Sequence, residues 1–364
     1  MNKIWLYGAG NVGTKIYEKI LPNDEKAEFA GFIDSKKYGQ SINGYKIVKI
    51  EDVPKDDIII IAVKSSEMIV QIYDSLRKLR YKNIFLYNAN EKLKIKKTNL
   101  LQDYCINCCD WGDIVLPQAE IHVSDYCNLN CRGCTHYSPI FDRILPNTKE
   151  RIHDIKLLAL KFSHVVDFYL LGGEPFLNPD IEEYILSAYT LLPNSRIHIV
   201  TNGLLLPKIP EKIFTTIRKY DVDISISEYK PTHDRIDEIK MVLDKNNIKY
   251  DIRPFDQKQL FNKPLTKMCN TDYEKLCISN GCVNIWNGKI ARCPSLMYVQ
   301  ELNAKFGLNL PSDGIYSLED KMPGERLKEL LKEEVPLCSY CVKNPIEWSC
   351  CGANPVATDF VETD

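Results

Sequence analysis

The stretch HVSDYCNLNCRGCTHYSP, residues 122–139, carries cysteines at positions 127, 131 and 134. It follows directly on AEIHVSD (119–125), where apolar and polar residues alternate as they do in a half-buried β-strand. A chain that places three thiols on a loop right after a strand brings three potential metal ligands to one end of that strand. The nature of these thiols decides both the fold and the function that we expect.

Composition and charge narrow the classes of protein to consider. With 364 residues the chain is long enough for about two or three domains. Its net charge of -2 gives no electrostatic reason to expect nucleic acid or an anionic membrane as a partner. The apolar run IIIIAV (58–63) is far too short to span a bilayer, and the N-terminus MNKIWLYGAG leads into a strand rather than a signal peptide. We therefore expect a cytoplasmic protein without a membrane or nucleic-acid partner.

The cysteines divide the chain. In a reducing cytoplasm, 14 cysteines are expected to serve as metal ligands more than as disulfides. None precedes Cys105, and a basic, polar joint lies at 91–99. We predict an α/β protein with four parts: a Rossmann-like domain at 1–95, a linker at 96–118, a partial (β/α)6 TIM-like barrel at 119–265, and a small cysteine-rich extension at 266–364.

The front segment alternates strand and helix patterns, which predicts a parallel sheet covered by helices. Its first turn, Gly8-Ala9-Gly10-Asn11-Val12-Gly13, matches GxGxxG between a strand and a helix. Asp34 lies about twenty residues further on, where a ribose-binding acid is expected. With GFIDSKKYGQSINGYKIV (31–48), the segment resembles small nucleotide-binding domains attached to sugar-modifying enzymes. Two interpretations are open. In one, a nucleotide binds at Gly8, Gly10, Gly13 and Asp34, and in the other, the glycines serve only to form a tight turn.

A second α/β series begins at residue 119. Five strand patterns, each followed by a helix pattern or a turn, extend to about residue 255. Units of this length favour a TIM-like barrel, whose chemistry lies at the C-terminal ends of the strands. The three cysteines follow the first of these strands, in the position where such a barrel reacts.

Four interpretations of the three thiols compete. A disulfide would pair two of the three cysteines and leave the third unpaired, and disulfides are not expected in a reducing compartment. A single catalytic cysteine would not require two further cysteines beside it. Zinc usually takes four ligands in CxxC-type pairs, whereas Cys127, Cys131 and Cys134 are spaced CxxxCxxC. An iron–sulfur cluster held by three thiolates, with one iron open, agrees best with the spacing. Asn128, Asn130 and Gly133 favour a loop that turns tightly enough to aim three sulfurs at one point.

Over roughly residues 119–255 the chain resembles the radical S-adenosylmethionine (radical SAM) enzymes. The likeness rests on the CxxxCxxC loop, on Gly172-Gly173-Glu174-Pro175 after the second strand, and on polar residues that end the third and fourth strands. It implies that Cys127, Cys131 and Cys134 hold a [4Fe–4S] cluster. It also implies an S-adenosylmethionine site formed by Gly172, Gly173, Glu174, Pro175, Asn202, Ser225 and Ser227. For Ser225 a helix-capping role is the alternative.

The resemblance has one departure. Where the family often has an aromatic residue before the third cysteine, this chain has Gly133, so adenine would need another surface such as Tyr126 or Tyr137. His136, two residues after Cys134, is a candidate for reaching the site, whereas His122 and His198 lie on strand patterns and are expected in the core or lining. The reaction that the resemblance implies is reductive cleavage of S-adenosylmethionine to a 5′-deoxyadenosyl radical, which abstracts hydrogen from a substrate. An electron donor such as flavodoxin or ferredoxin is the implied partner.

The C-terminal third is expected to carry an auxiliary cluster. In CISNGCVNIWNGKIARCPSL (277–296), Asn287-Gly288 predicts a hairpin turn. The region resembles the extensions called twitch and SPASM domains, which implies an auxiliary [4Fe–4S] cluster on Cys277, Cys293, Cys338 and Cys341. A zinc knuckle is the alternative, and Cys105, Cys108 and Cys109 have no assigned role.

Two hypotheses for the substrate follow. The first is oxidation or rearrangement of a small polar molecule, in particular a nucleotide-activated sugar held partly by the front domain. The second is maturation of a ribosomally made peptide. The front segment favours the first hypothesis, because it does not have the pattern of a winged-helix peptide-recognition module.

Overall fold

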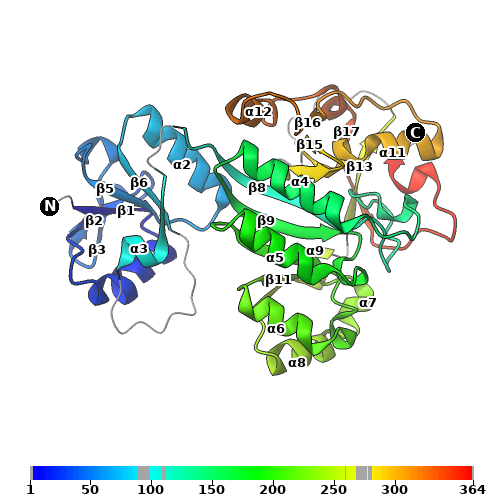
Figure 1. Cartoon of the computed structure of the whole chain (residues 1–364), viewed down its shortest axis with the longest axis horizontal. Helices are drawn as coiled ribbons and strands as arrows, with labels where there is room; N and C mark the ends of the chain where they lie inside the picture. Colours follow the sequence, from blue (N-terminus) through cyan, green and yellow to red (C-terminus); the bar gives the residue numbers. More distant parts are fainter. Residues whose placement is uncertain are drawn as a thin grey trace. The chain divides into compact units, whose positions relative to one another are not determined.

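The computed structural model describes residues 3–87, 99–108, 112–258, 260–267, 277 and 281–362. The chain forms two compact units, Met1–Pro117 and Gln118–Asp364, called the first and second unit below (Figure 1). The second unit begins one residue before the predicted start of the second α/β series at 119. Among the described residues, no helix is long and apolar enough to cross a membrane.

The first unit is built on a five-stranded sheet of order β2-β1-β5-β6-β7. The strands follow the apolar runs of the sequence, and β1, β2, β5 and β6 are parallel. The last strand, β7, joins β6 in the antiparallel direction. Their bounds are Ile4–Tyr7 (β1), Phe29–Ile33 (β2), Ile58–Ile61 (β5), Asn83–Tyr87 (β6) and Cys105–Asn107 (β7). The predicted parallel sheet of the front segment is confirmed, and β7 lies where a linker was expected.

Helices of the first unit begin at the polar caps that the sequence provides. α2 (Ser66–Lys78) is capped by the Ser65 hydroxyl and α3 (Leu100–Tyr104) by the Asn99 side chain. α1 (Asn11–Lys15) continues as a π-helix to Ile20. Buried Leu100 and Tyr104 pack in the core around β1 and β5. Because of this packing, residues 100–107 are part of the first unit rather than a linker. A small hairpin, β3 (Ser41–Ile42) and β4 (Tyr45–Lys46), completes the unit.

The second unit contains an eight-stranded sheet of order β12-β11-β10-β9-β8-β14-β15-β16. Strands β9, β10, β11 and β12 are parallel to one another, and β14 is parallel to β8. The predicted Asn287-Gly288 hairpin between β14 and β15 is confirmed, with φ of 50° and 72°, as a turn of this kind requires. The bounds are Val115–Ser124 (β8), His164–Gly172 (β9), Arg196–Thr201 (β10), Asp223–Ser227 (β11), Tyr250–Arg253 (β12), Asn284–Trp286 (β14), Lys289–Ala291 (β15) and Tyr316–Ser317 (β16).

Helices connect the parallel strands of this sheet (Figure 1). They are α4 (Thr148–Lys161), α5 (Ile181–Leu191), α6 (Glu211–Lys219) and α8 (Ile236–Lys245), with the short helices α7 (Lys230–His233) and α9 (Phe255–Lys258) after β11 and β12. Alternate strand residues such as Phe168, Ile197 and Ile224 are apolar and buried. Buried apolar residues also line α4, α5, α6 and α8, so one face of the sheet is apolar.

The C-terminal part of the second unit adds helices α10 (Pro294–Met297), α11 (Val299–Phe306) and α12 (Gly324–Leu330) and a small sheet of order β17-β13-β18. Its strands are β13 (Leu260–Thr266), β17 (Cys341–Glu347) and β18 (Val361–Glu362). One apolar core joins this part to the cysteine loop, because Tyr137 and Ile140 pack in the same cluster as Tyr298 and Phe360. The loop after β8 is therefore held from the C-terminal side as well as from the sheet.

Candidate functional site

Cys127, Cys131 and Cys134 lie on the loop that leaves the C-terminal end of β8. The end of β9 holds the start of this loop through backbone hydrogen bonds. Gly173 N donates to Ser124 O at 2.8 Å, and Glu174 N donates to Tyr126 O at 3.2 Å. The predicted cysteine loop and the predicted GGEP stretch are therefore direct neighbours.

Gly172 and Gly173 are required by this close approach. A Cβ atom at Gly173 would lie 2.0 Å from Tyr126 O and 2.7 Å from Cys127 N. A Cβ atom at Gly172, where φ is +124°, would lie 2.2 Å from Ser124 O. We expected these glycines to admit a ligand, and the structure shows that they admit the backbone of the cysteine loop.

Hydrogen-bond donors surround the sulfur atoms of the loop. Leu129 N donates to Cys127 Sγ at 3.3 Å, and the Asn202 amide lies 3.7 Å from the same sulfur. The Trp348 indole N–H donates to Cys131 Sγ at 3.3 Å. Burial raises the pKa of all three thiols, and the charges of neighbouring cysteines add to this for Cys131. Metal binding reverses that effect, because a metal holds thiols as thiolates. Three thiols with donors aimed at two of their sulfurs form a ligand set that fits a three-thiolate iron–sulfur cluster.

Glu174 is fully buried beside this loop, and burial raises the pKa of its carboxyl to about 7. Its Oε1 accepts hydrogen bonds from the Thr201 hydroxyl at 2.7 Å and from Phe176 N at 3.3 Å. Its Oε2 accepts from Asn202 N at 3.0 Å. Glu174 therefore ties the end of β9 to the end of β10. A cationic ligand group beside it would favour the ionised carboxylate.

The other residues predicted to bind S-adenosylmethionine lie at the ends of β9 to β11, except Ser225, which lies within β11. Asn202 follows β10, and its side-chain amide donates to Asn128 Oδ1 of the cysteine loop at 2.7 Å. Pro175 begins a short 3-10 turn. Ser227 is the last residue of β11, and Ser225, two residues earlier, donates its hydroxyl to Asp251 at 2.9 Å. Ser225 is thus paired across the sheet and caps no helix.

The aromatic and histidine candidates take different places. Tyr137 is fully buried and packs edge-on against Phe360, so it belongs to the core, whereas Tyr126 is half-buried. His136 Nδ1 lies 2.9 Å from His122 Nε2, and His122 Nδ1 lies 3.0 Å from Asp125. Burial lowers the pKa of both histidines. The contact between His136 and His122 therefore connects the cysteine loop to β8.

The face of the sheet opposite the apolar face carries polar side chains that pair across neighbouring strands. Arg196 of β10 donates to Asp167 of β9 at 2.7 Å, and His198 lies 3.0 Å from the same carboxylate. The Tyr169 ring stacks on His198 with centroids 4.7 Å apart. Glu120 of β8 is buried, and burial raises the pKa of its carboxyl to about 7. This face can offer hydrogen bonds to a polar molecule.

Among the four cysteines predicted for an auxiliary cluster, Cys341 lies within electrostatic reach of the other three. Burial raises the pKa of Cys341 to about 12, with added contributions from Cys293, Cys338 and Cys277. Cys293 precedes α10, and Cys338 lies on the 3-10 turn before Cys341, the first residue of β17. A [4Fe–4S] cluster or a zinc ion held by these four thiols stays a prediction.

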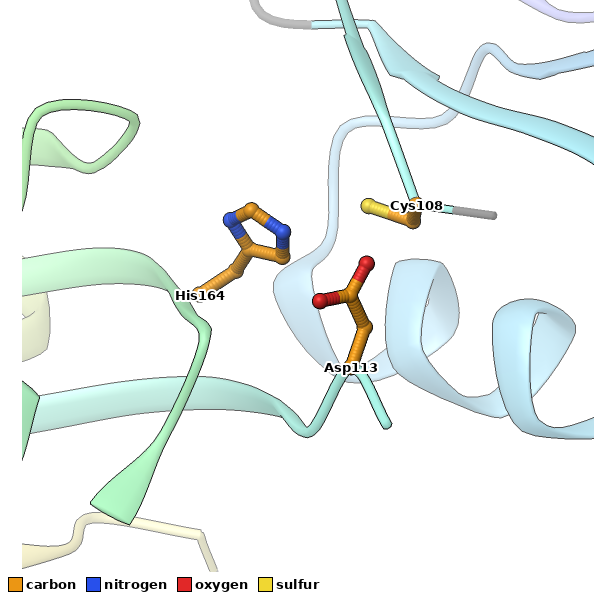
Figure 2. Close-up of side chains that lie close together, drawn as sticks. All are labelled: Cys108, Asp113 and His164. Carbon is orange, nitrogen blue, oxygen red and sulfur yellow. The ribbon is translucent and has the colours of Figure 1, made fainter. Parts of the chain in front are cut away.

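Other described cysteines lie elsewhere. The Cys282 side chain contacts Glu120. The backbone of Cys350 forms an isolated antiparallel β-bridge with the backbone of Cys131, and both thiols are free. Cys108 and Asp113 of the first unit are drawn in Figure 2, and their potential ligand atoms lie within 4.8 Å of each other. Figure 2 also shows His164, the first residue of β9 in the second unit. Two ligands do not complete a metal site in the first unit, and Cys109 lies outside the described residues.

The glycine-rich turn of the first unit is held by Asp34. This carboxylate accepts hydrogen bonds from Ala9 N at 3.1 Å and from Lys36 N at 2.9 Å. The Lys37 ammonium donates to Ala9 O at 2.7 Å. Gly13 allows helix and strand to meet, since a Cβ atom there would lie 2.0 Å from Gly8 O. A Cβ atom at Gly10 would meet nothing within 4 Å.

Two residues near the cluster loop were missed by the sequence reasoning. Trp348 lies about two hundred residues beyond Cys131 in the chain, and no motif marks it. Tyr229 follows β11, and its pKa is raised by burial and then by the charges of Cys131 and Cys134. A signal was available only for Tyr229, because it comes two residues after the predicted ligand Ser227.

Comparisons with known proteins agree with this geometry. Residues 121–248 match the model of the Radical SAM superfamily, and residues 1–98 match that of the C2185-like N-terminal family. The match supports the expected radical SAM domain in this part of the chain, and such a domain implies S-adenosylmethionine and a [4Fe–4S] cluster as cofactors. A GTP 3′,8-cyclase of Microcystis aeruginosa is 29% identical over 125 residues, which cover 32% of this chain and 36% of that protein. The chain thus spans about a third of the length of this curated relative.

Two solved structures with bound AdoMet are also similar to this chain. anSMEcpe with bound AdoMet (S-adenosylmethionine) is 18% identical with a TM-score of 0.31, covering 38% of this chain and 43% of that one. BtrN in complex with AdoMet and 2-DOIA is 14% identical with a TM-score of 0.40, covering 63% of this chain and 94% of that one. Similarity at this level says nothing about the substrate of this chain.

Proposed function

We propose that Cys127, Cys131 and Cys134 hold a [4Fe–4S] cluster and that S-adenosylmethionine binds beside it, at the ends of β9, β10 and β11. When bound, the cluster supplies the electron that cleaves S-adenosylmethionine to the hydrogen-abstracting 5′-deoxyadenosyl radical. The observation that carries the proposal is the contact between the cysteine loop and the GGEP turn at Tyr126 and Glu174.

The residues of the chain have separate tasks in this proposal. Gly172 and Gly173 let the end of β9 approach the cysteine loop and fix its start. Buried Glu174 accepts the ammonium group of S-adenosylmethionine, because charge-assisted hydrogen bonds favour an ionised carboxylate in a dry site. Asn202 connects the cofactor site to the loop through Asn128. Ser227, at the end of β11, offers a hydroxyl to the same molecule.

We further propose that the substrate is a small polar molecule, in particular a nucleotide-activated sugar, which is oxidised or rearranged. The support comes from the polar face of the sheet, where Asp167, His198 and Ser225 offer hydrogen-bonding groups. The four cysteines of the C-terminal part support the proposal of an auxiliary [4Fe–4S] cluster that accepts an electron from the substrate. A redox-neutral rearrangement would need no such acceptor.

In the first unit, the support for nucleotide binding is the Lys37 ammonium at the glycine-rich turn. Replacing Lys37 with alanine in the full chain should weaken nucleotide binding, because a positive charge in contact with the turn is lost. Replacing the exposed neighbour Lys36 removes the same charge and serves as the matched control. Calorimetry with UDP-glucose, GDP-mannose and the free diphosphates measures the effect. Equal binding by both variants would contradict a phosphate site at this turn.

The substrate class is tested by hydrogen transfer. The reconstituted enzyme is incubated anaerobically with S-adenosylmethionine and nucleotide sugars carrying deuterium on the sugar ring. Deuterium that appears in 5′-deoxyadenosine identifies the sugar as the hydrogen donor. Transfer from the backbone or side chains of a ribosomal peptide, with none from any sugar, would reverse the choice between the two hypotheses.

A further inference from the structure

The C-terminal segment after β17 runs directly along the cysteine loop. Arg132 N donates a hydrogen bond to Ser349 O at 2.9 Å, and Cys351 N donates to Asn130 O at 2.6 Å. These two bonds lie on either side of Cys131. The segment therefore has a fixed position beside that ligand, although it lies more than two hundred residues away in the chain.

Trp348 uses this position to reach the sulfur. Its indole N–H donates to Cys131 Sγ at 3.3 Å. The indole ring stacks on Tyr229, with centroids 5.9 Å apart and planes inclined by 16°. The stack holds the indole ring, and the hydrogen bond to Ser349 O fixes the backbone next to Trp348. The direction of the N–H is thus determined by two independent contacts.

We propose that Trp348 is a positioning residue that raises the reduction potential of the cluster on Cys127, Cys131 and Cys134. The inference rests on the cluster site of the proposed function. Reduction adds negative charge to a cluster, and a hydrogen bond to a ligand sulfur stabilises the reduced form more than the oxidised form. The Trp348 N–H therefore makes the cluster easier to reduce by a protein electron donor, and it lowers the driving force for passing the electron on.

The test replaces Trp348 with phenylalanine, which keeps an aromatic ring against Tyr229 and removes the N–H. The matched control is Trp5→Phe in the first unit, which likewise removes an indole N–H, one that donates to Asp57 at 3.0 Å. Both variants and the wild type are reconstituted anaerobically, and iron is counted. The midpoint potential is then measured by EPR-monitored redox titration of the signal that changes when S-adenosylmethionine is added. That change separates the barrel cluster from any auxiliary cluster.

We expect Trp348→Phe to bind as much iron as the wild type and to show a more negative midpoint potential, with no change in Trp5→Phe. A potential equal to that of the wild type would overturn the inference and leave the proposed function intact. A wild type without any signal that responds to S-adenosylmethionine would overturn both. If Trp348→Phe does not fold, benzothienylalanine at position 348 replaces only the N–H with sulfur. The same negative shift is expected there, and an unchanged potential refutes the role of the N–H.

Discussion

Glu174→Gln separates the charge of this side chain from its shape. The carboxylate accepts three hydrogen bonds, with Thr201 and Phe176 on Oε1 and Asn202 N on Oε2. Glutamine has one acceptor oxygen, so it can keep the first two bonds only if its NH2 group faces the N–H of Asn202. The Asn202 N–H and the new NH2 group then face each other as two buried donors without an acceptor, and each costs about 1–3 kcal/mol of unfolding free energy. Urea unfolding of the cluster-free protein measures this loss.

The same substitution should weaken cofactor binding. Loss of a charge-assisted hydrogen bond to the ammonium group costs about 1.5–3 kcal/mol, or roughly a 10- to 150-fold higher Kd for S-adenosylmethionine. Equilibrium dialysis with the reconstituted protein measures Kd. Exposed Glu325 of α12 provides the control, since Glu325→Gln removes one carboxylate without touching the site. A reconstituted Glu174→Gln protein that binds S-adenosylmethionine as tightly as the wild type would refute the role of this carboxylate.

Three further predictions follow from the packing and charges of the second unit. Gly173→Ala should lower iron content and S-adenosylmethionine binding, because the new Cβ atom would lie 2.0 Å from Tyr126 O of the cysteine loop. Gly352→Ala is the control and should leave both unchanged, since a Cβ atom there would have no neighbour within 4 Å. The wild type should contain about eight irons per chain, as two four-iron clusters do, and replacing Cys338 and Cys341 together with alanine should halve this content. The same variant should not release oxidised product. Zinc bound to the wild type in place of the second cluster would contradict this prediction. Because burial raises the pKa of Glu120 to about 7 from the ordinary 4.5, the folded protein holds a proton that the unfolded chain has lost. The Glu120 carboxyl should therefore lower the unfolding free energy by roughly 3 kcal/mol as pH rises from about 4.5 to about 7. Glu120→Gln should remove this contribution and leave the one from Glu174, whose pKa is also raised to about 7.

Local patterns were enough to predict most elements of the parallel sheets and the hairpin at Asn287-Gly288. The apolar run at 58–61 and the alternation of polar and apolar residues at 196–199 both favour a strand. The spacing of Cys127, Cys131 and Cys134 likewise needs only one loop. The linker predicted at 96–118 includes residues 100–107, which pack into the first unit through only two buried side chains, Leu100 and Tyr104, and so short an apolar pattern does not predict a docked helix.

Other features depend on contacts between distant parts of the chain. The sequence suggests that Gly172 and Gly173 approach something closely, but only the fold shows that it is the cysteine loop. Tyr137 looks like a possible adenine surface until its packing against Phe360 is known. Trp348 has no local signal at all, since its partner Cys131 lies in another part of the sequence and the hydrogen bond forms only when the C-terminal segment returns to the loop.

The central claim is that three cysteines after β8 hold the cluster that cleaves S-adenosylmethionine. The most direct measurement compares the reconstituted wild type with a variant in which Cys127, Cys131 and Cys134 are all alanine, under strong reductant and without oxygen. We predict that the variant loses about four irons per chain, the content of one [4Fe–4S] cluster, and forms no 5′-deoxyadenosine. A triple variant that still forms 5′-deoxyadenosine from S-adenosylmethionine would contradict the assignment of these three ligands.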